Sequence, residues 1–135
     1  MLLEYAHAHL GRARTSPAVL HAWAQKLSHS PGRRYLSYWV ALTRLRRGEA
    51  GLAYSAARAA LQAPQTADNP ELHWRLAALA FLAGKAISSA QDGAAMRAQA
   101  ENGRQRISES WGEDAPAYFG RHDLTLLHRL PAVAR

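Results

Sequence analysis

Seven histidines are the side chains of this 135-residue sequence best suited to hold a metal ion. His7 and His9 lie two positions apart, so on a helix they would point about 200° away from each other and could not share a metal. His122 and His128 are six positions apart and would also lie on different faces. The sequence contains no cysteine and no His-Glu-x-x-His segment. We therefore expect no metal site.

The ten carboxylates give little indication of acid–base catalysis. Glu113 and Asp114 form the only adjacent pair, and a loop followed by a helix cap explains them. Most of the acidic residues stand at expected helix starts, where capping and the helix dipole favour them: Glu49, Asp68, Glu71, Asp114 and Asp123. The sequence has no Walker loop, nucleotide-binding glycine fingerprint or nucleophile elbow. We expect no catalytic residues, no cofactor and no enzymatic activity.

Arginine supplies most of the formal net charge of +7, since only two of the 17 basic residues are lysines. Arginine is well suited to phosphate recognition, which makes nucleic acid a possible partner. An arginine-rich and alanine-rich composition would also follow from a GC-rich genome. The candidate binding surface is a basic ridge of four residues: Arg33, Arg34, Arg44 and Arg47. This ridge could bind an acidic peptide or a nucleic-acid backbone, or it could simply be solvated.

The composition and the apolar spacing predict an all-α fold. Alanine, the strongest helix former, occurs 29 times, whereas β-branched residues are scattered. A helix over 33–47 would place one set of apolar side chains within about 120° of arc, so this face must be buried: Tyr35, Tyr38, Trp39, Leu42 and Leu45. The basic ridge falls on the opposite side. Tyr35, Tyr38, Trp39 and Trp74 could instead line a ligand groove, but their helical spacing favours the core.

Glycine, proline and asparagine mark where the next helices begin and end. Gly48 would turn the chain into an alanine-rich helix that ends at Pro64. Asn69 and Pro70 then have the types expected at a helix cap and at the first helical position. The helix over 71–83 is apolar almost all round, so we expect it at the centre of the core.

The rest of the chain is assigned more coarsely. We expect one helix over 2–12 and a second from Ser16 to the SPG sequence at 30–32. A long, partly exposed helix should cover 86–111, and a bend or break at Asn102 and Gly103 is one alternative for it. Two short helices follow, one with Pro116 in its first turn and one over 123–130. Their aromatic and leucine side chains would fold the tail back over the preceding helices, and Trp111, Tyr118, Phe119, Leu124, Leu127 and Leu130 are the residues concerned.

Two segments of the sequence match each other at a spacing of 36 residues. Aligning Gly48 with Gly84 (84 − 48 = 36) also aligns Leu36 with Leu72, Tyr38 with Trp74, Ala41 with Ala77 and Ala50 with Ala86. A period of this length is typical of helical-hairpin repeats. The two segments resemble the tetratricopeptide family, with Gly48 and Gly84 as the turns within each repeat. Small residues that this resemblance requires stand at Ala41, Ala53, Ala60, Ala77 and Ser89, while Met96 departs from it.

The resemblance implies a short array of antiparallel helical hairpins forming one domain. It divides the chain into a degenerate or capping hairpin over 1–32, repeats over 33–66 and 69–110, and a capping tail over 111–135. The closing sequences ISESW and YFGRHDLTLLHRL resemble the ends of helical-repeat regions in large bacterial signalling ATPases and transcriptional activators. These regions sense or scaffold and do not catalyse.

We therefore expect a non-catalytic protein–protein interaction or regulatory module of a bacterial signalling or transcriptional regulator. The alternative is a basic nucleic-acid-binding accessory domain. A protein partner or a second copy of the chain is the expected ligand, because a short array leaves its ends exposed. The start of the sequence lacks a secretory pattern, and the most apolar stretch, 72–87, is short and contains charges, so we expect a cytoplasmic protein without a membrane partner.

Overall fold

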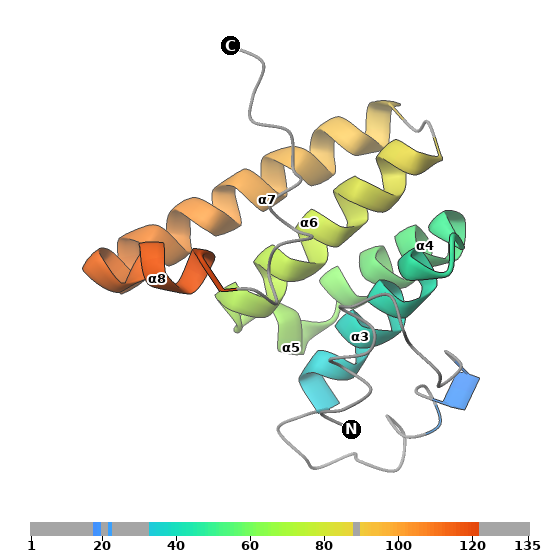
Figure 1. The fold of residues 1–135 in the computed structure, drawn as a ribbon, viewed down its shortest axis with the longest axis horizontal. Coiled ribbons are helices and arrows are strands. Elements are labelled where there is room, and N and C mark those ends of the chain that lie inside the picture. Colours follow the sequence, from blue (N-terminus) through green and yellow to red (C-terminus); the bar gives the residue numbers. More distant parts are fainter. Residues whose placement is uncertain (1–17, 20–21, 23–32, 88–89, 122–135) are drawn as a thin grey trace.

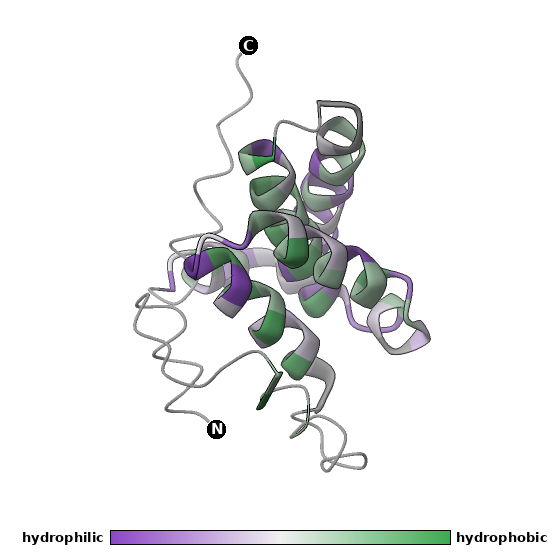
Figure 2. Ribbon diagram, turned by 90° about the vertical axis from the view of Figure 1, so that its right-hand side faces the viewer, coloured by the Kyte–Doolittle hydropathy of each residue, from purple (hydrophilic) through white to green (hydrophobic). Residues whose placement is uncertain are grey.

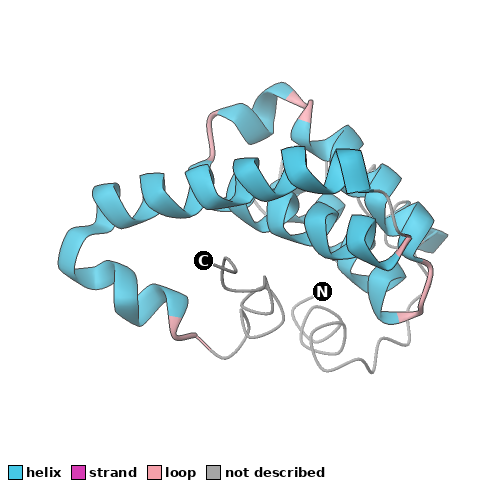
Figure 3. Ribbon diagram, turned by 90° about the horizontal axis from the view of Figure 1, so that it is seen from above, coloured by secondary structure: helices cyan, strands magenta, loops and turns pink. Residues whose placement is uncertain are grey.

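The computed structural model describes residues 18, 19, 22, 33–87 and 90–121, and every regular element in these ranges is a helix (Figure 3). Four helices are long: α3 (Arg33–Arg46), α4 (Ala50–Leu61), α6 (Pro70–Ala86) and α7 (Ala90–Trp111). The shorter elements are α5 (Pro64–Ala67), the 3-10 helix η1 (Gly112–Asp114) and α8 (Ala115–Phe119). The prediction of an all-α protein is confirmed for these ranges.

Some of the predicted elements lie outside the described residues. This holds for the helices expected over 2–12 and 123–130, for most of the capping hairpin over 1–32, and for Ser89. Residues 18, 19 and 22, within the helix expected after Ser16, are helical.

Local sequence explains where α6 begins. Asn69 has an extended backbone, and its Oδ1 atom accepts a hydrogen bond from the backbone N–H of Leu72 at 3.1 Å. Pro70 occupies the first helical position, where its missing N–H leaves no hydrogen bond unmade. Glu71 lies in the first turn, where the helix dipole favours its negative charge. The predicted cap and first turn are confirmed.

Gly48 makes the turn between α3 and α4, as expected from the sequence. Its φ of +80° lies in the left-handed region, which glycine adopts without steric cost. Pro64 has a different role from the predicted one: α4 ends at Leu61, and Pro64 begins α5 instead of ending α4. The buried Thr66 hydroxyl then donates to the Ala60 carbonyl at 2.6 Å, which fixes this short connection against the end of α4.

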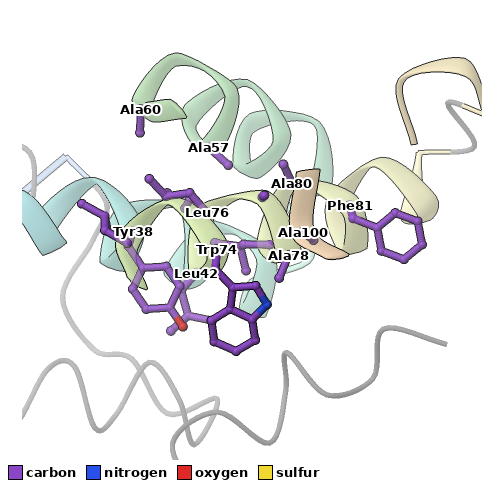
Figure 4. Packing of buried hydrophobic residues seen from close by; sticks show 14 of the residues in the cluster. Tyr38, Leu42, Ala57, Ala60, Trp74, Leu76, Ala78, Ala80, Phe81 and Ala100 are labelled. Atoms are coloured by element: carbon purple, nitrogen blue, oxygen red, sulfur yellow. The ribbon is translucent and has the colours of Figure 1, made fainter. Parts of the chain in front are cut away.

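Helix α6 is the centre of the structure, in agreement with the sequence. It packs against α3, α4 and α7, and Figure 1 shows it between α7 on one side and the α3–α4 pair on the other. Eleven of its 17 residues are buried. Figure 4 labels Trp74 of α6 with Tyr38 and Leu42 of α3 as members of one buried cluster, and all three side chains are fully buried. Figure 2 shows hydrophobic segments in the middle of this packing and hydrophilic segments at several helix ends.

The contacts also give the directions of the helices. Glu71, at the start of α6, bonds to Tyr118, which follows the end of α7, so α6 and α7 run in opposite directions. Tyr35, at the start of α3, bonds to the same Glu71, so α3 and α6 start on the same side of the structure. After α7 the chain reverses, and α8 packs back against it (Figure 3).

Two glycines that the sequence suggested as breaks lie inside continuous helices. Gly84 was expected to form a turn equivalent to that at Gly48, but α6 continues through it to Ala86. A Cβ atom at Gly84 would lie 3.2 Å from the ring of Tyr54 in α4. Gly103 does not break α7 either, and a Cβ atom there would lie 3.1 Å from Trp74 Cβ. Both positions need glycine because a neighbouring helix approaches closely, and neither needs it for a turn.

Candidate functional site

The four arginines of the predicted basic ridge lie at the two ends of α3. Arg33 and Arg34 begin α3, whereas Arg44 lies in its last turn and Arg47 follows the helix in the turn to α4. Arg34 and Arg44 are ten residues apart, which corresponds to about 15 Å along a helix axis. The side chains of Arg33 and Arg34 lie outside the described part of the structure. The four arginines are thus two pairs at opposite ends of one helix.

The pair at the end of α3 is compensated by an acidic residue. Arg44 Nη1 lies 3.3 Å from Glu49 Oε2, and Arg47 Nε lies 3.0 Å from Glu49 Oε1. The side chain of Arg44 is 27% exposed and that of Arg47 is 47% exposed. The two guanidinium groups share one carboxylate, so an excess of one positive charge remains here. This arrangement also ties α3 to the start of α4.

A second set of polar residues surrounds Glu71 at the start of α6. Its Oε1 atom accepts hydrogen bonds from Arg75 Nη2 at 2.7 Å and from the Tyr118 hydroxyl at 2.9 Å. Its Oε2 atom accepts one from the Tyr35 hydroxyl at 3.1 Å. These four residues, which we call the Glu71 cluster, come from α3, α6 and α8. The carboxylate therefore joins three helices at one point.

The environment of the Glu71 cluster suits a structural role better than proton transfer. The side chain of Arg75 is only 3% exposed and lies against the rings of Tyr35 and Tyr38, with its guanidinium carbon 5.9 and 5.6 Å from their centroids. Burial, as the largest cause, raises the pKa of both the Tyr35 and the Tyr118 hydroxyls, so both stay protonated and donate near neutral pH. Both carboxylate oxygens accept hydrogen bonds from these side chains, so the carboxylate is held in place by residues of three helices.

Sequence reasoning explained Glu71 as a residue that favours the helix start and missed its tyrosine partners. The spacing contained a usable indication, because Tyr35 and Glu71 are 36 residues apart, the same interval that aligns the two matching segments. Tyr118 could not be found in this way, since its approach depends on the chain reversing after α7. The expected cap at Asp114 is wrong in one respect: Asp114 precedes α8, but its side chain accepts no capping hydrogen bond.

Three of the four aromatic residues that could have lined a groove belong to the core, as the helical spacing favoured, while Tyr35 is partly buried and packs against it. Tyr38 and Trp74 are fully buried, and Trp39 is 8% exposed. Trp74 packs edge-on against Phe119, with ring centroids 5.3 Å apart. The predicted folding back of the tail is confirmed for Tyr118 and Phe119, which are buried, whereas Trp111 is 44% exposed.

A broad, open cleft of about 590 Å³ lies between the last turns of α7 and α8. Arg104 forms one side, with its guanidinium carbon 4.7 Å from the Phe119 ring centroid on the other. Ser108 and the backbone at Gly112 complete part of the lining. The cleft has one cationic group and a mostly small or apolar surface, so it offers no set of side chains for acid–base chemistry.

In the part of the chain that the structure describes, no group of three or more His, Cys, Asp or Glu side chains is placed to hold a metal ion. Among the helices of residues 33–87 and 90–121, we find none with the length and apolar character that crossing a bilayer requires.

Comparison of the chain with protein-family models, with curated proteins and with solved structures finds no match in any of the three.

Proposed function

We propose that this chain is a non-catalytic protein–protein interaction module built from tetratricopeptide-like helical hairpins. The observation that carries the proposal is the hydrogen bond between Tyr35 and Glu71, 36 residues apart, which links the starts of two helices that run in the same direction. A further helix packs on each of these two, α4 on α3 and α7 on α6. Two successive helix pairs stacked at a fixed sequence interval are typical of repeat proteins that bind other proteins.

The chemistry of the polar residues supports binding over catalysis. The carboxylate with the most contacts, Glu71, already accepts three hydrogen bonds that join helices. The full sequence carries a formal net charge of +7, and the described surface exposes single apolar side chains such as Leu52 and Trp111. We propose a protein that contacts these apolar side chains as the partner, and a bacterial signalling or transcriptional regulator as the setting.

Nucleic-acid binding is the second candidate, and the positive net charge is the observation that favours it. The compensation of Arg44 and Arg47 by Glu49 weakens this candidate, because a phosphate would have to displace the carboxylate or share the arginines with it. The two candidates also predict different salt dependence. Each phosphate neutralised adds about 0.9 to the slope of log K against log salt for duplex DNA.

The experiment that tests the proposal begins with a tagged copy of the chain captured from a bacterial lysate, with and without nuclease. A protein that stays bound after nuclease is then purified, and its Kd for the chain is measured over a salt series. A saturable complex whose affinity changes little with salt supports the interaction module. Binding that disappears with nuclease and follows the slope above would refute it in favour of nucleic acid. Sedimentation of the chain alone separately tests a second copy as the partner, and a monomer at high concentration would exclude it.

A further inference from the structure

A small polar pocket lies between α6 and α7, away from the Glu71 cluster and from the cleft at Phe119. It is lined by His73 of α6 and by Gln99, Asn102, Gly103 and Arg106 of α7, and its volume is about 90 Å³. Organic ligands normally occupy pockets of about 300–1,000 Å³, whereas a water molecule takes about 30 Å³ of liquid. The pocket is therefore the size of a small ion or of one end group of a larger ligand.

The charge and the hydrogen-bond donors of the pocket indicate that the ion is an anion. No carboxylate lines it, and none of the acidic residues in the described ranges forms an ion pair with Arg106. A guanidinium group, two primary amides and an imidazole can together offer N–H donors from two helices. His73 is half-buried, and burial, followed by the charge of Arg106, lowers its pKa, as expected for an imidazole beside a cation without a counter-ion.

We propose that this pocket binds a phosphate group. A tetrahedral oxyanion presents acceptor oxygens in several directions to donors on both helices, whereas the two oxygens of a carboxylate lie in one plane. Arginine can bond two phosphate oxygens at once through its planar fork. The bound charge would neutralise Arg106 and draw the α6–α7 pair together at His73. This inference does not depend on the interaction function proposed above.

The same chemistry fits free phosphate and a phosphate group carried by a serine or threonine side chain. Arg106 and Asn102 are exposed, so the pocket is open to a group that enters from solvent. We therefore use two probes, inorganic phosphate and O-phosphoserine, each added to the isotope-labelled full chain at constant ionic strength set with chloride. Constant ionic strength keeps general screening the same in all samples.

Amide and imidazole NMR signals report on binding at the pocket. We expect saturable shifts at Gln99, Asn102 and Arg106 and a rise in the pKa of His73 as the anion offsets the neighbouring cation. Arg106→Gln should weaken binding at least about tenfold, because it removes the only charged donor of the pocket. Tighter binding of phosphoserine than of inorganic phosphate would assign the site to a modified partner, and the reverse would assign it to the free ion.

Arg97→Gln is the matched control. Arg97 lies on the same helix, but it pairs with Glu101 at 2.9 Å and does not line the pocket. Asn102→Ala provides a second test on an exposed helical position where alanine is well tolerated, and it should also weaken binding. The proposal is overturned if neither probe gives saturable shifts at about 20 mM, a concentration that reveals even millimolar affinity. It is also overturned if the Arg97 and Arg106 variants bind alike.

Discussion

The contact between α6 and α7 at Gly103 leads to a prediction in which one substitution has opposite effects at two sites of the same helix. Gly93 and Gly103 both lie inside α7, and helix propensity alone predicts that alanine at either position stabilises the protein by about 1 kcal/mol. The surroundings of the two glycines differ. A Cβ atom at Gly93 would have no heavy atom within 4 Å, whereas at Gly103 it would lie 3.1 Å from Trp74 Cβ and 3.2 Å from Trp74 Cα.

The atoms that crowd Gly103 decide the sign of the effect. Trp74 Cα belongs to the backbone of α6, and Trp74 is fully buried, so neither atom can move without shifting the helix or the core. Forcing an extra methyl group into packed surroundings costs about 1–3 kcal/mol. After subtracting the propensity gain, Gly103→Ala should be between neutral and about 2 kcal/mol destabilising. Gly93→Ala should be about 1 kcal/mol stabilising.

Urea unfolding of the full chain, followed by circular dichroism, measures both changes in the free energy of unfolding. The informative quantity is the difference between the two variants, because helix propensity cancels and the steric contribution of about 1–3 kcal/mol remains. Unchanged m-values would show that the unfolding transitions are comparable. If both alanine variants were stabilised equally, α7 could not approach Trp74 as closely as described, and the assignment of Gly103 to a helix contact would be wrong.

Three further outcomes are expected. Trp74→Ala should lower the free energy of unfolding by about 3–5 kcal/mol, because a fully buried indole is lost, and an unchanged melting temperature would contradict the described core. Glu71→Gln should lower the free energy of unfolding, measured by chemical denaturation, by about 3 kcal/mol, because Arg75 stays buried without its carboxylate. The control Glu101→Gln, at an exposed ion pair, should change it by no more than about 0.5 kcal/mol. The folded-state pKa of His73 lies below the ordinary 6.5, so this residue contributes stability above pH 6.5 that is lost as the pH falls towards the lower pKa. In urea titrations at several pH values, His73→Gln should therefore make the decline in the free energy of unfolding shallower. An identical pH profile would count against the burial of the imidazole.

The sequence was sufficient to predict features that depend on local chemistry. The helix start at Asn69 and Pro70 follows from capping, and the turn at Gly48 follows from the backbone freedom of glycine. The position of α6 at the centre followed from its apolar surface all round. Each of these inferences needs only a few neighbouring residues.

Features that depend on the approach of separate helices could not be predicted in the same way. The partners of Glu71 come from α3 and α8, and Tyr118 reaches it only because α8 packs back against α7. The basic ridge was placed by the angle of each residue around the helix axis, which omits the distance between the two ends of α3. The acidic partner of Arg44 and Arg47 also lies beyond the helix, at Glu49.

The 36-residue match holds for residues on the packed faces of α3 and α6 and fails at the ends of these helices. Tyr38 and Trp74 are both fully buried, as are Ala41 and Ala77, because each pair occupies the packed face of its helix. The match fails at the helix ends: α3 stops at Arg46, equivalent to position 82 (46 + 36 = 82), while α6 continues four residues further to Ala86 (86 − 82 = 4).

The residues before the two aligned glycines explain this difference. Arg46 and Arg47 precede Gly48 and are exposed, so α3 has no contact to gain by continuing. Ala83 precedes Gly84 and is fully buried, and α6 continues because α4 and α7 both pack against it. A glycine preceded by exposed arginines therefore ends a helix here, whereas a glycine preceded by a buried alanine lets a neighbouring helix approach. Burial of the preceding residues, which a repeat alignment does not consider, separates the roles of these two glycines.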